Sequence, residues 1–247
     1  MPKIALLSDI HGNIDALEAV ISKEKADEWL CLGDIVGYNP DPEECVNKIK
    51  DLCTHVIAGN HDQGTVNMLD KKWFNTMARI VIEWTENNLS PDSIQYLKEL
   101  PLRKKLSYEG YNIIIAHGYP DLNNPFKYIM RAYDLKNINS FIKDIDITFV
   151  GHTHVPGVFK KYKGKWKFTK AVKGLKINIK PKTKYIINVG SVGQPRDGNS
   201  QASYSIFHPQ RSIIEIKRVD YDIKNVQEKI YERGLPHNLA QRLEVGR

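Results

Sequence analysis

Five apolar segments of this chain end in short turns that carry aspartate, histidine or asparagine beside a glycine. In chain order the turns are Asp9-Ile10-His11-Gly12, Gly33-Asp34, Gly59-Asn60-His61-Asp62, His117-Gly118 and Gly151-His152-Thr153-His154. Carboxylate and imidazole groups together suit transition metals such as Mn, Fe, Zn or Ni better than Ca or Mg. The glycines let the backbone turn sharply and bring ligands close to one point. A single histidine at a strand end is by default a packed or solvated residue, but the five turns together predict a metal site.

The segments between the first three turns alternate in the manner of an α/β protein. Short apolar runs at 3–7, 29–32 and 54–58 are separated by helical apolar spacing over 13–25 and by a helix start at Asp41-Pro42. This alternation predicts a parallel sheet with right-handed crossovers. Because such sheets bind ligands outside the carboxyl ends of their strands, we expect the metal site at that edge.

The rest of the chain predicts more helices and many more strands. Helical patterns cover 70–99 with a break near 87–91, and then 134–143, 222–232 and 239–244. Strand patterns cover 103–108, 111–116, 147–150, 158–162, 165–169, 184–189, 202–208 and 212–217. These strands are too many for one sheet, and no repeat or linker divides the 247 residues. We expect one domain over 1–247, in which 1–154 carries the metal motifs, 155–217 forms the second-sheet strands and 218–247 forms C-terminal helices.

The composition narrows the class of protein. With 41% hydrophobic and 26% charged residues, the bulk of the chain is neither disordered nor fibrous. No apolar stretch approaches the ~20 residues of a membrane span, and the start lacks the pattern of a signal peptide. Cys31, Cys45 and Cys53 have no CxxC spacing and are typical of reduced, packed thiols. We therefore expect a cytoplasmic protein without a membrane partner.

The order and approximate spacing of the turns over residues 4–154 resemble the motif series of calcineurin-like metallophosphoesterases. The turn Gly190-Ser191-Val192-Gly193 extends the resemblance to about residue 208. The likeness is greatest to the compact prokaryotic branch of phosphodiesterases and phosphatases. It implies an α/β fold of two packed mixed β-sheets flanked by helices, an αββα sandwich, with the site at one edge. Gly37 departs from the pattern, because many members have Asp there, and this argues against the larger protein-phosphatase branch.

The resemblance also implies two groups of metal ligands that share one carboxylate. Asp9, His11, Asp34 and His154 would hold one ion, and Asp34, Asn60, His117 and His152 would hold the other. A carboxylate such as Asp34 can bridge two cations and partly neutralise both. Two ions ~3.5–4 Å apart can share a hydroxide and hold phosphoryl oxygens during in-line displacement. We expect two divalent transition-metal ions, manganese first, with Fe, Zn, Ni and Co also suited to these ligands.

Five further residues near these turns are candidates for catalysis or substrate binding. His61 follows a predicted ligand, so its side chain should point away from that ligand and toward the leaving group. It could act there as a general acid or as a cationic stabiliser, or it could have a structural role only. Asp62, the next residue, could orient the His61 ring. Asn13 could donate to a phosphate oxygen or cap the helix that begins there. Arg196 could bind phosphate through its guanidinium fork or pair with the aspartate that follows it. Tyr38 would wall the substrate pocket or pack within its own loop.

The net charge of +7 originates in one segment. Residues 147–196 hold eleven Lys, one Arg and no acidic residue, whereas the rest of the chain has 24 basic and 29 acidic residues and a charge of −5. Two interpretations fit this segment: a positive rim that guides an anionic substrate, or solvated lysines on a β-hairpin. The sequence leaves the role of the lysines in 160–184 open.

These features predict a dinuclear metal-dependent phosphoesterase that hydrolyses phosphodiester or phosphomonoester bonds of a small anionic substrate, with nucleotides among the candidates. One alternative is a phosphoprotein phosphatase. Another is a non-catalytic scaffold, which should lack ligands, whereas this chain has them all. A third is a nucleic-acid-binding protein, which no zinc-finger or RNA-binding motif supports. We expect the partner to be a small phosphorylated substrate, and we expect nucleic acid to bind only as a substrate. A homo-oligomer is compatible with the sequence.

Overall fold

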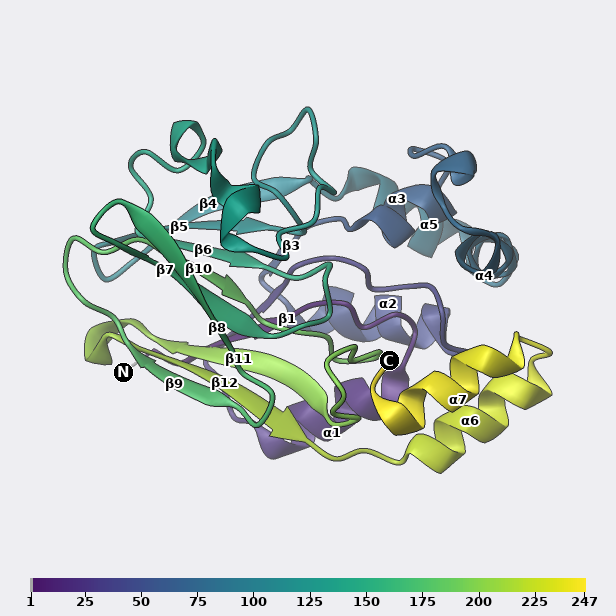
Figure 1. The fold of residues 1–247 in the computed structure, drawn as a ribbon. Coiled ribbons are helices and arrows are strands. Elements are labelled where there is room, and N and C mark those ends of the chain that lie inside the picture. Colours follow the sequence, from purple (N-terminus) through teal and green to yellow (C-terminus); the bar gives the residue numbers. More distant parts are fainter. Residues whose placement is uncertain (1) are drawn as a thin grey trace.

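Two mixed β-sheets pack face to face in the computed structural model, which describes residues 2–247, and helices cover their outer faces (Figure 1). Across the first sheet, the strands are β3 (His55–Val56), β2 (Glu28–Cys31), β1 (Ile4–Leu7), β11 (Ala202–His208), β12 (Ile213–Val219) and β9 (Leu175–Asn178). Across the second sheet, they are β4 (Arg103–Tyr108), β5 (Tyr111–Ala116), β6 (Ile147–Val150), β10 (Tyr185–Asn188), β7 (Gly157–Tyr162) and β8 (Lys165–Lys170). The predicted αββα sandwich is confirmed.

Strand β1 shows how the first sheet buries both of its faces. Ile4 and Leu6 lie in the core between the two sheets, whereas Ala5 and Leu7 lie in the core beneath the helices. A continuous apolar run is what a strand covered on both sides requires. Because β1 pairs in parallel with β2 and antiparallel with β11, its carboxyl end is held from both sides.

Helices α1 (Ile14–Lys23) and α2 (Pro42–Leu52) pack on the outer face of the first sheet. Their starts are set locally, since Asn13 caps α1 and Pro42 occupies the first turn of α2. The other helices are α3 (Asn60–Thr65), α4 (Thr76–Asn87), α5 (Pro91–Glu99), α6 (Ile223–Glu232) and α7 (His237–Val245), with 3₁₀ helices η1 (Lys71–Trp73), η2 (Ala132–Leu135), η3 (Ile138–Ser140) and η4 (Pro209–Arg211). α4, α6 and α7 share a small core with Tyr38. Within residues 2–247, no helix is long and apolar enough to cross a bilayer.

The prediction that residues 155–217 supply the strands of the second sheet holds for only part of this segment. β7, β8 and β10 join the second sheet, but β9, β11 and β12 join the first. β11 pairs with β1, and β10 pairs with β6, so later strands complete both sheets. The physical reason is that each sheet begun in the first half leaves an edge of unpaired backbone groups, which a later strand satisfies.

Two local predictions also differ from the structure. The expected helix over 134–143 is instead the pair of short 3₁₀ helices η2 and η3. Short polar side chains compete there with helical hydrogen bonds, as when Ser140 Oγ donates to the Asn137 carbonyl at 2.9 Å. Strand β9 was not predicted, because four residues at a sheet edge show too little alternation to be recognised.

Candidate metal centre

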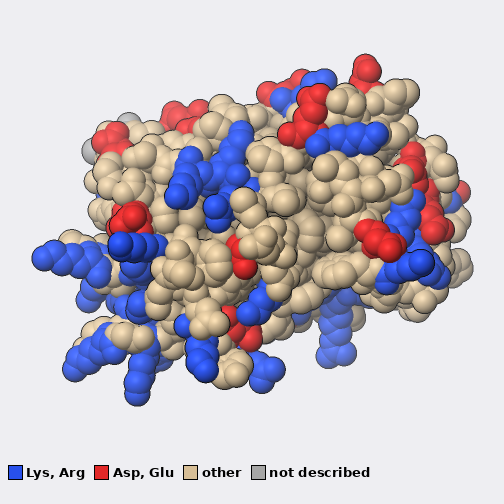
Figure 2. All heavy atoms as spheres, turned by 90° about the horizontal axis from the view of Figure 1, so that it is seen from above, with Lys and Arg blue, Asp and Glu red and all other residues tan. Residues whose placement is uncertain are grey.

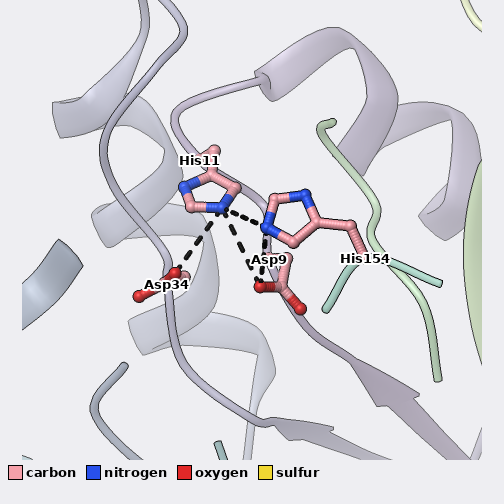
Figure 3. A group of neighbouring side chains, drawn as sticks. All are labelled: Asp9, His11, Asp34 and His154. Atoms are coloured by element: carbon pink, nitrogen blue, oxygen red, sulfur yellow. Dashed lines mark hydrogen bonds and ion pairs between the residues drawn. The ribbon is translucent and has the colours of Figure 1, made fainter. Parts of the chain in front are cut away.

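The predicted ligands converge in two groups at the carboxyl ends of strands from both sheets. One ligand atom from each of Asp9, His11, Asp34 and His154 lies within 4.8 Å of the others, as Figure 3 shows for these side chains. Atoms of Asp34, His117 and His152 meet the same criterion. All six side chains are buried. Asp34 belongs to both groups, which is the arrangement that a bridging carboxylate needs.

Five of these ligands hold a backbone conformation that residues other than glycine rarely adopt. The φ angles are 53° at Asp9, 53° at His11, 52° at Asp34, 65° at His152 and 57° at His154. The left-handed region costs L-residues roughly 1–2 kcal/mol each, and strain of this kind clusters at functional sites. The strained turns aim side chains from separate strands at one point.

Two glycines leave space for the carboxylates. A Cβ on Gly59 would lie 2.1 Å from Asp34 Oδ1, and a Cβ on Gly151 would lie 2.4 Å from Asp9 Oδ2. Neither glycine has a positive φ. At positions 59 and 151 glycine is therefore needed because it has no side chain, and not because its backbone is free to turn, as the sequence suggested.

Each of the four ligand imidazoles donates one ring N–H to a backbone carbonyl. The acceptors are Val36 O for His11 (3.2 Å), Leu32 O for His117 (2.8 Å), Phe126 O for His152 (2.8 Å) and Gln194 O for His154 (2.5 Å). Such bonds fix the tautomer and the ring orientation of metal-binding histidines. In the neutral ring, the second nitrogen is left as a lone-pair donor.

The free ring nitrogens and the carboxylate oxygens lie close together. His11 Nε2 is 3.1 Å from His154 Nε2, which is 3.2 Å from Asp9 Oδ1. Because Nδ1 already donates in both rings, the neutral rings present only lone pairs to each other and to the carboxylate. Lone pairs this close repel one another unless positive charge lies between them. These residues therefore fit a bound metal ion.

Burial sets the ionisation of most of the rings. It lowers the pKa of His152 to about 3, and it lowers the pKa values of His11 and His154 as well. Burial acts on His117 in the same direction, but the nearby Asp34 carboxylate raises the pKa of that ring to about 9. Three of the four imidazoles are thus neutral at pH 7, which is the form that binds metal.

Asn60, the uncharged ligand of the second predicted group, is the first residue of α3 and is buried. Its Oδ1 has no hydrogen-bond partner within residues 2–247. An unpaired buried acceptor costs about 1–3 kcal/mol, so such atoms are rare unless a ligand satisfies them. The amide oxygen of Asn60 therefore fits the role of a metal ligand.

His61 lies beside these ligands but has a different environment. Its Nδ1 is buried without a hydrogen-bond partner within residues 2–247, and its ring centroid lies 4.8 Å from that of His11 and 4.4 Å from that of Tyr38. Burial lowers the pKa of His61 to about 4. Gly37 makes room for the ring, because a Cβ there would lie 2.5 Å from His61 Nδ1. In this chain, a side chain at position 37 would therefore meet the His61 ring.

The prediction that Asp62 orients the His61 ring is wrong. Asp62 Oδ1 accepts hydrogen bonds from the amides of Ile35 (2.8 Å) and Val36 (3.2 Å), and Oδ2 accepts one from the Gly59 amide (2.9 Å). Adjacent side chains at a helix start point in different directions, so the carboxylate turns back to the loop after β2. Asp62 joins two ligand-bearing turns and acts as a structural residue.

Of the two roles expected for Asn13, the structure bears out the helix cap, and it leaves neither polar atom of the side chain free for a substrate. Its Oδ1 accepts a hydrogen bond from the Ala16 amide at 3.0 Å, and its Nδ2 donates to the Gly193 carbonyl at 3.0 Å. The side chain is fully buried. Because both polar atoms are engaged in the fold, Asn13 is the cap of α1 and the link to the turn at 190–193.

Arg196 does not pair with Asp197, which instead pairs with Arg218. The Arg196 Nε and Nη2 atoms donate to Gln194 Oε1 at 3.2 and 2.7 Å, and Cζ lies 5.4 Å from the centroid of the Tyr38 ring. The same Tyr38 ring packs against His61. The structure therefore places both Arg196 and Tyr38 next to the metal centre, as the pocket interpretation requires.

One side of the site is aromatic, which the sequence did not predict. Tyr128 stacks on the His152 ring with centroids 4.0 Å apart and an angle of 17° between the planes, and 45% of its surface is exposed. Phe126 supplies the carbonyl that holds His152. Both residues lie in the irregular loop after β5, where no periodicity or motif distinguishes them in the sequence.

The lysine-rich segment does not encircle the centre. β7 begins three residues after His154, and the turn at Lys163–Gly164 lies at the other end of the β7–β8 hairpin, roughly 20 Å along the strands. Lys163, Lys165 and Lys167 are exposed. Figure 2 shows basic side chains that project together from one corner of the surface. For most of the segment, the structure favours solvated lysines on a hairpin.

Comparisons with known proteins agree with this architecture. A sequence model described as the calcineurin-like phosphoesterase superfamily domain matches residues 2–212. Uncharacterized protein MJ0912 of Methanocaldococcus jannaschii is 39% identical over 247 residues, which span 99% of this chain and 98% of that protein. The crystal structure of a metallophosphoesterase from Sphaerobacter thermophilus has a TM-score of 0.87 and 36% identity, with 100% of this chain and 99% of that chain covered. Hypothetical protein PH1004 from Pyrococcus horikoshii shares the fold, with a TM-score of 0.80 and 21% identity over 100% of this chain and 99% of that one.

Asp62→Ala should destabilise the protein strongly. It removes the acceptor of three buried amides, and each unsatisfied donor costs about 1–3 kcal/mol. We expect the free energy of unfolding in urea to fall by about 3 kcal/mol or more. Asp51→Ala, at an exposed position in α2, is the matched control and should change it by less than about 0.5 kcal/mol. Equal stability of Asp62→Ala and wild type would contradict the structural role of Asp62.

The chelator-treated protein should lose stability as the pH falls from 7 to 5. Burial lowers the pKa of His152 to about 3 and that of His61 to about 4, whereas unfolded histidine titrates near ~6.5. In this range the unfolded chain binds more protons, so acid favours unfolding. Burial raises the pKa of Asp62 to about 7, and the Asp34 carboxylate raises that of His117 to about 9. Both groups oppose the trend, but these two are outweighed by the four lowered imidazoles of His11, His61, His152 and His154. Calorimetric melting at each pH tests this; a rising Tm toward pH 5 would be inconsistent with it.

Proposed function

The chain belongs to the calcineurin-like phosphoesterase superfamily, as its motifs indicated, and on this premise we propose that it hydrolyses phosphodiester or phosphomonoester bonds with two bound divalent metal ions. The observation that carries the proposal is the pair of buried ligand groups that share Asp34. Manganese is the ion we propose, and Fe, Zn, Ni and Co suit the same mixture of nitrogen and oxygen donors.

Two ions in this centre would neutralise phosphoryl oxygens and lower the pKa of a bound water. Asp9, His11, Asp34 and His154 would hold one ion, and Asp34, Asn60, His117 and His152 would hold the other. The chain prepares these donors in advance. Backbone carbonyls orient the imidazoles, and left-handed turns direct them inward, so little reorganisation accompanies binding.

We propose that His61 protonates the leaving group. Its ring lies against His11 and Tyr38, and its Nδ1 is free of protein partners within residues 2–247. Burial lowers its pKa to about 4, so the ring is neutral at pH 7 in the free protein. An anionic phosphate beside the ring would raise this pKa and favour the protonated form. The protonated ring would then donate to the departing oxygen.

The substrate we propose is small and anionic, with nucleotides included. Arg196, whose Cζ lies 5.4 Å from the Tyr38 ring centroid, would bind a phosphate oxygen through its remaining N–H groups. Tyr128 presents a half-exposed ring beside His152, on which a flat organic group of the substrate would lie. These contacts suit a compact ester better than a protein chain.

The test is a panel of phosphate esters offered to chelated protein reloaded with Mn, Fe, Zn, Ni or Co in turn. p-Nitrophenyl phosphate and bis(p-nitrophenyl) phosphate represent monoesters and diesters. We expect hydrolysis with at least one metal, and His61→Gln should lower kcat by about 10²–10⁴-fold, because a general acid contributes that much. If no ester is cleaved with any metal, the proposed function is wrong.

The metal content of the His61→Gln variant distinguishes a lost general acid from a lost metal ligand. The variant should bind as much metal as the wild type, since His61 is not among the ligands. His55→Gln is the matched control, because His55 lies in β3 beside Glu28 and outside the site. Its kcat should equal that of the wild type. Loss of metal from His61→Gln would show that His61 is a ligand and not the acid.

A further inference from the structure

A second arginine, Arg242 of α7, lies at the same tyrosine ring as Arg196. The Cζ atoms of Arg196 and Arg242 lie 5.4 and 5.9 Å from the centroid of the Tyr38 ring. That ring lies 4.7 Å from the His11 ring and 4.4 Å from the His61 ring, centroid to centroid. The Tyr38 ring therefore lies close to two guanidinium groups and to two histidines of the metal centre.

Neither guanidinium has an acidic side chain as a partner. Within residues 2–247, no Asp or Glu carboxylate lies within ion-pair distance of Arg196 or Arg242. The Arg196 guanidinium donates only to the neutral Gln194 side chain, and Arg242 Nε donates at 2.6 Å to a main-chain oxygen of Arg247, the last residue of the sequence. Both arginine side chains are partly buried. Since arginine stays charged at neutral pH, the N–H groups that remain free on two half-buried guanidiniums favour an anionic ligand.

The backbone fixes the two arginines relative to the centre. The Arg196 amide donates to the carbonyl of His154, a metal ligand, at 3.2 Å. Two residues later, the Gly198 amide donates to the Gly246 carbonyl at the end of α7, at 2.9 Å. One turn thus joins the ligand loop on one side and the helix of Arg242 on the other. Such preorganisation lowers the entropy lost when an anion binds.

We propose that Arg196 and Arg242 form a second anion site, which binds a phosphate joined to the one that is cleaved. This inference rests on the proposed phosphoesterase function and adds the substrate class, namely compounds with a P–O–P linkage such as nucleoside diphosphates. The terminal phosphate lies at the metal ligands and the next one at the guanidiniums. Water forms a bond to the terminal phosphorus, the bond to the bridging oxygen breaks, and a nucleoside monophosphate and orthophosphate leave.

The test compares ADP with AMP as substrates of the manganese-loaded full chain, with release of orthophosphate as the measurement. Only ADP carries a phosphate beyond the one cleaved, but its anhydride bond is also intrinsically more reactive than the ester bond of AMP, so the site is read from the change of the ADP/AMP ratio of kcat/KM between wild type and variant. Arg242→Gln should lower this ratio by about tenfold or more, mainly through the KM for ADP. Arg233→Gln, an exposed change of the same type next to α6, should leave the ratio as in wild type.

A second measurement is independent of turnover. Calorimetric titration with inorganic pyrophosphate and orthophosphate, in excess manganese, should show tighter binding of pyrophosphate by wild type and loss of this preference in Arg242→Gln. Thermal melting of each variant identifies a change that acts through folding. Equal affinity of wild type for the two anions, or an equal loss on ADP and AMP in Arg242→Gln, overturns the second anion site. Failure to cleave any ester of the panel with any metal overturns the proposed function instead, while the titration still decides the anion site.

Discussion

The negative charge of Asp9 and Asp34, buried where strands of both sheets end, is the constraint on which the rest of the site depends. Within residues 2–247, neither carboxylate pairs with a lysine or arginine; the basic groups near them are the imidazoles of His11, His117 and His154. The rings of His11 and His154 are neutral at pH 7, and each of the three rings already donates an N–H to the backbone. A shared metal charge is what balances buried carboxylates without disturbing that arrangement.

The ends of the strands, rather than the core, hold the two carboxylates and their partners in place. β1 is fixed by strands on both sides, and the turns that follow β1, β2 and β6 hold ligands in left-handed conformations. Asp62 ties two of these turns together through three backbone amides. Around the rim, the Tyr38 ring lies close to His11 and close to both Arg196 and Arg242. The residues proposed for metal binding, for the leaving group and for anion binding therefore occupy neighbouring positions along one edge of the sandwich.

The sequence predicted the sandwich and the convergence of the ligands, because strand ends with Asp, His and Gly report directly on that edge. It did not predict which sheet each later strand joins, since that depends on the pairing of distant edges such as β11 with β1. The roles of the residues next to the ligands were harder to predict from the sequence. Asp62 and Asn13 have side chains suited to chemistry but bind the backbone, and Arg242 lies in a C-terminal helix without any motif. Side-chain direction and long-range contact decide such roles, and a single sequence shows neither.

The central claim is a centre of two ions bridged by Asp34, and metal stoichiometry tests it most directly. Protein dialysed against manganese and then freed of excess metal is analysed by mass spectrometry of its metal content, beside Asp34→Asn. The account predicts two ions per chain in the wild type and a loss from both positions in the variant, because Asp34 belongs to both ligand groups. Two ions retained by Asp34→Asn, or at most one in the wild type, would contradict it.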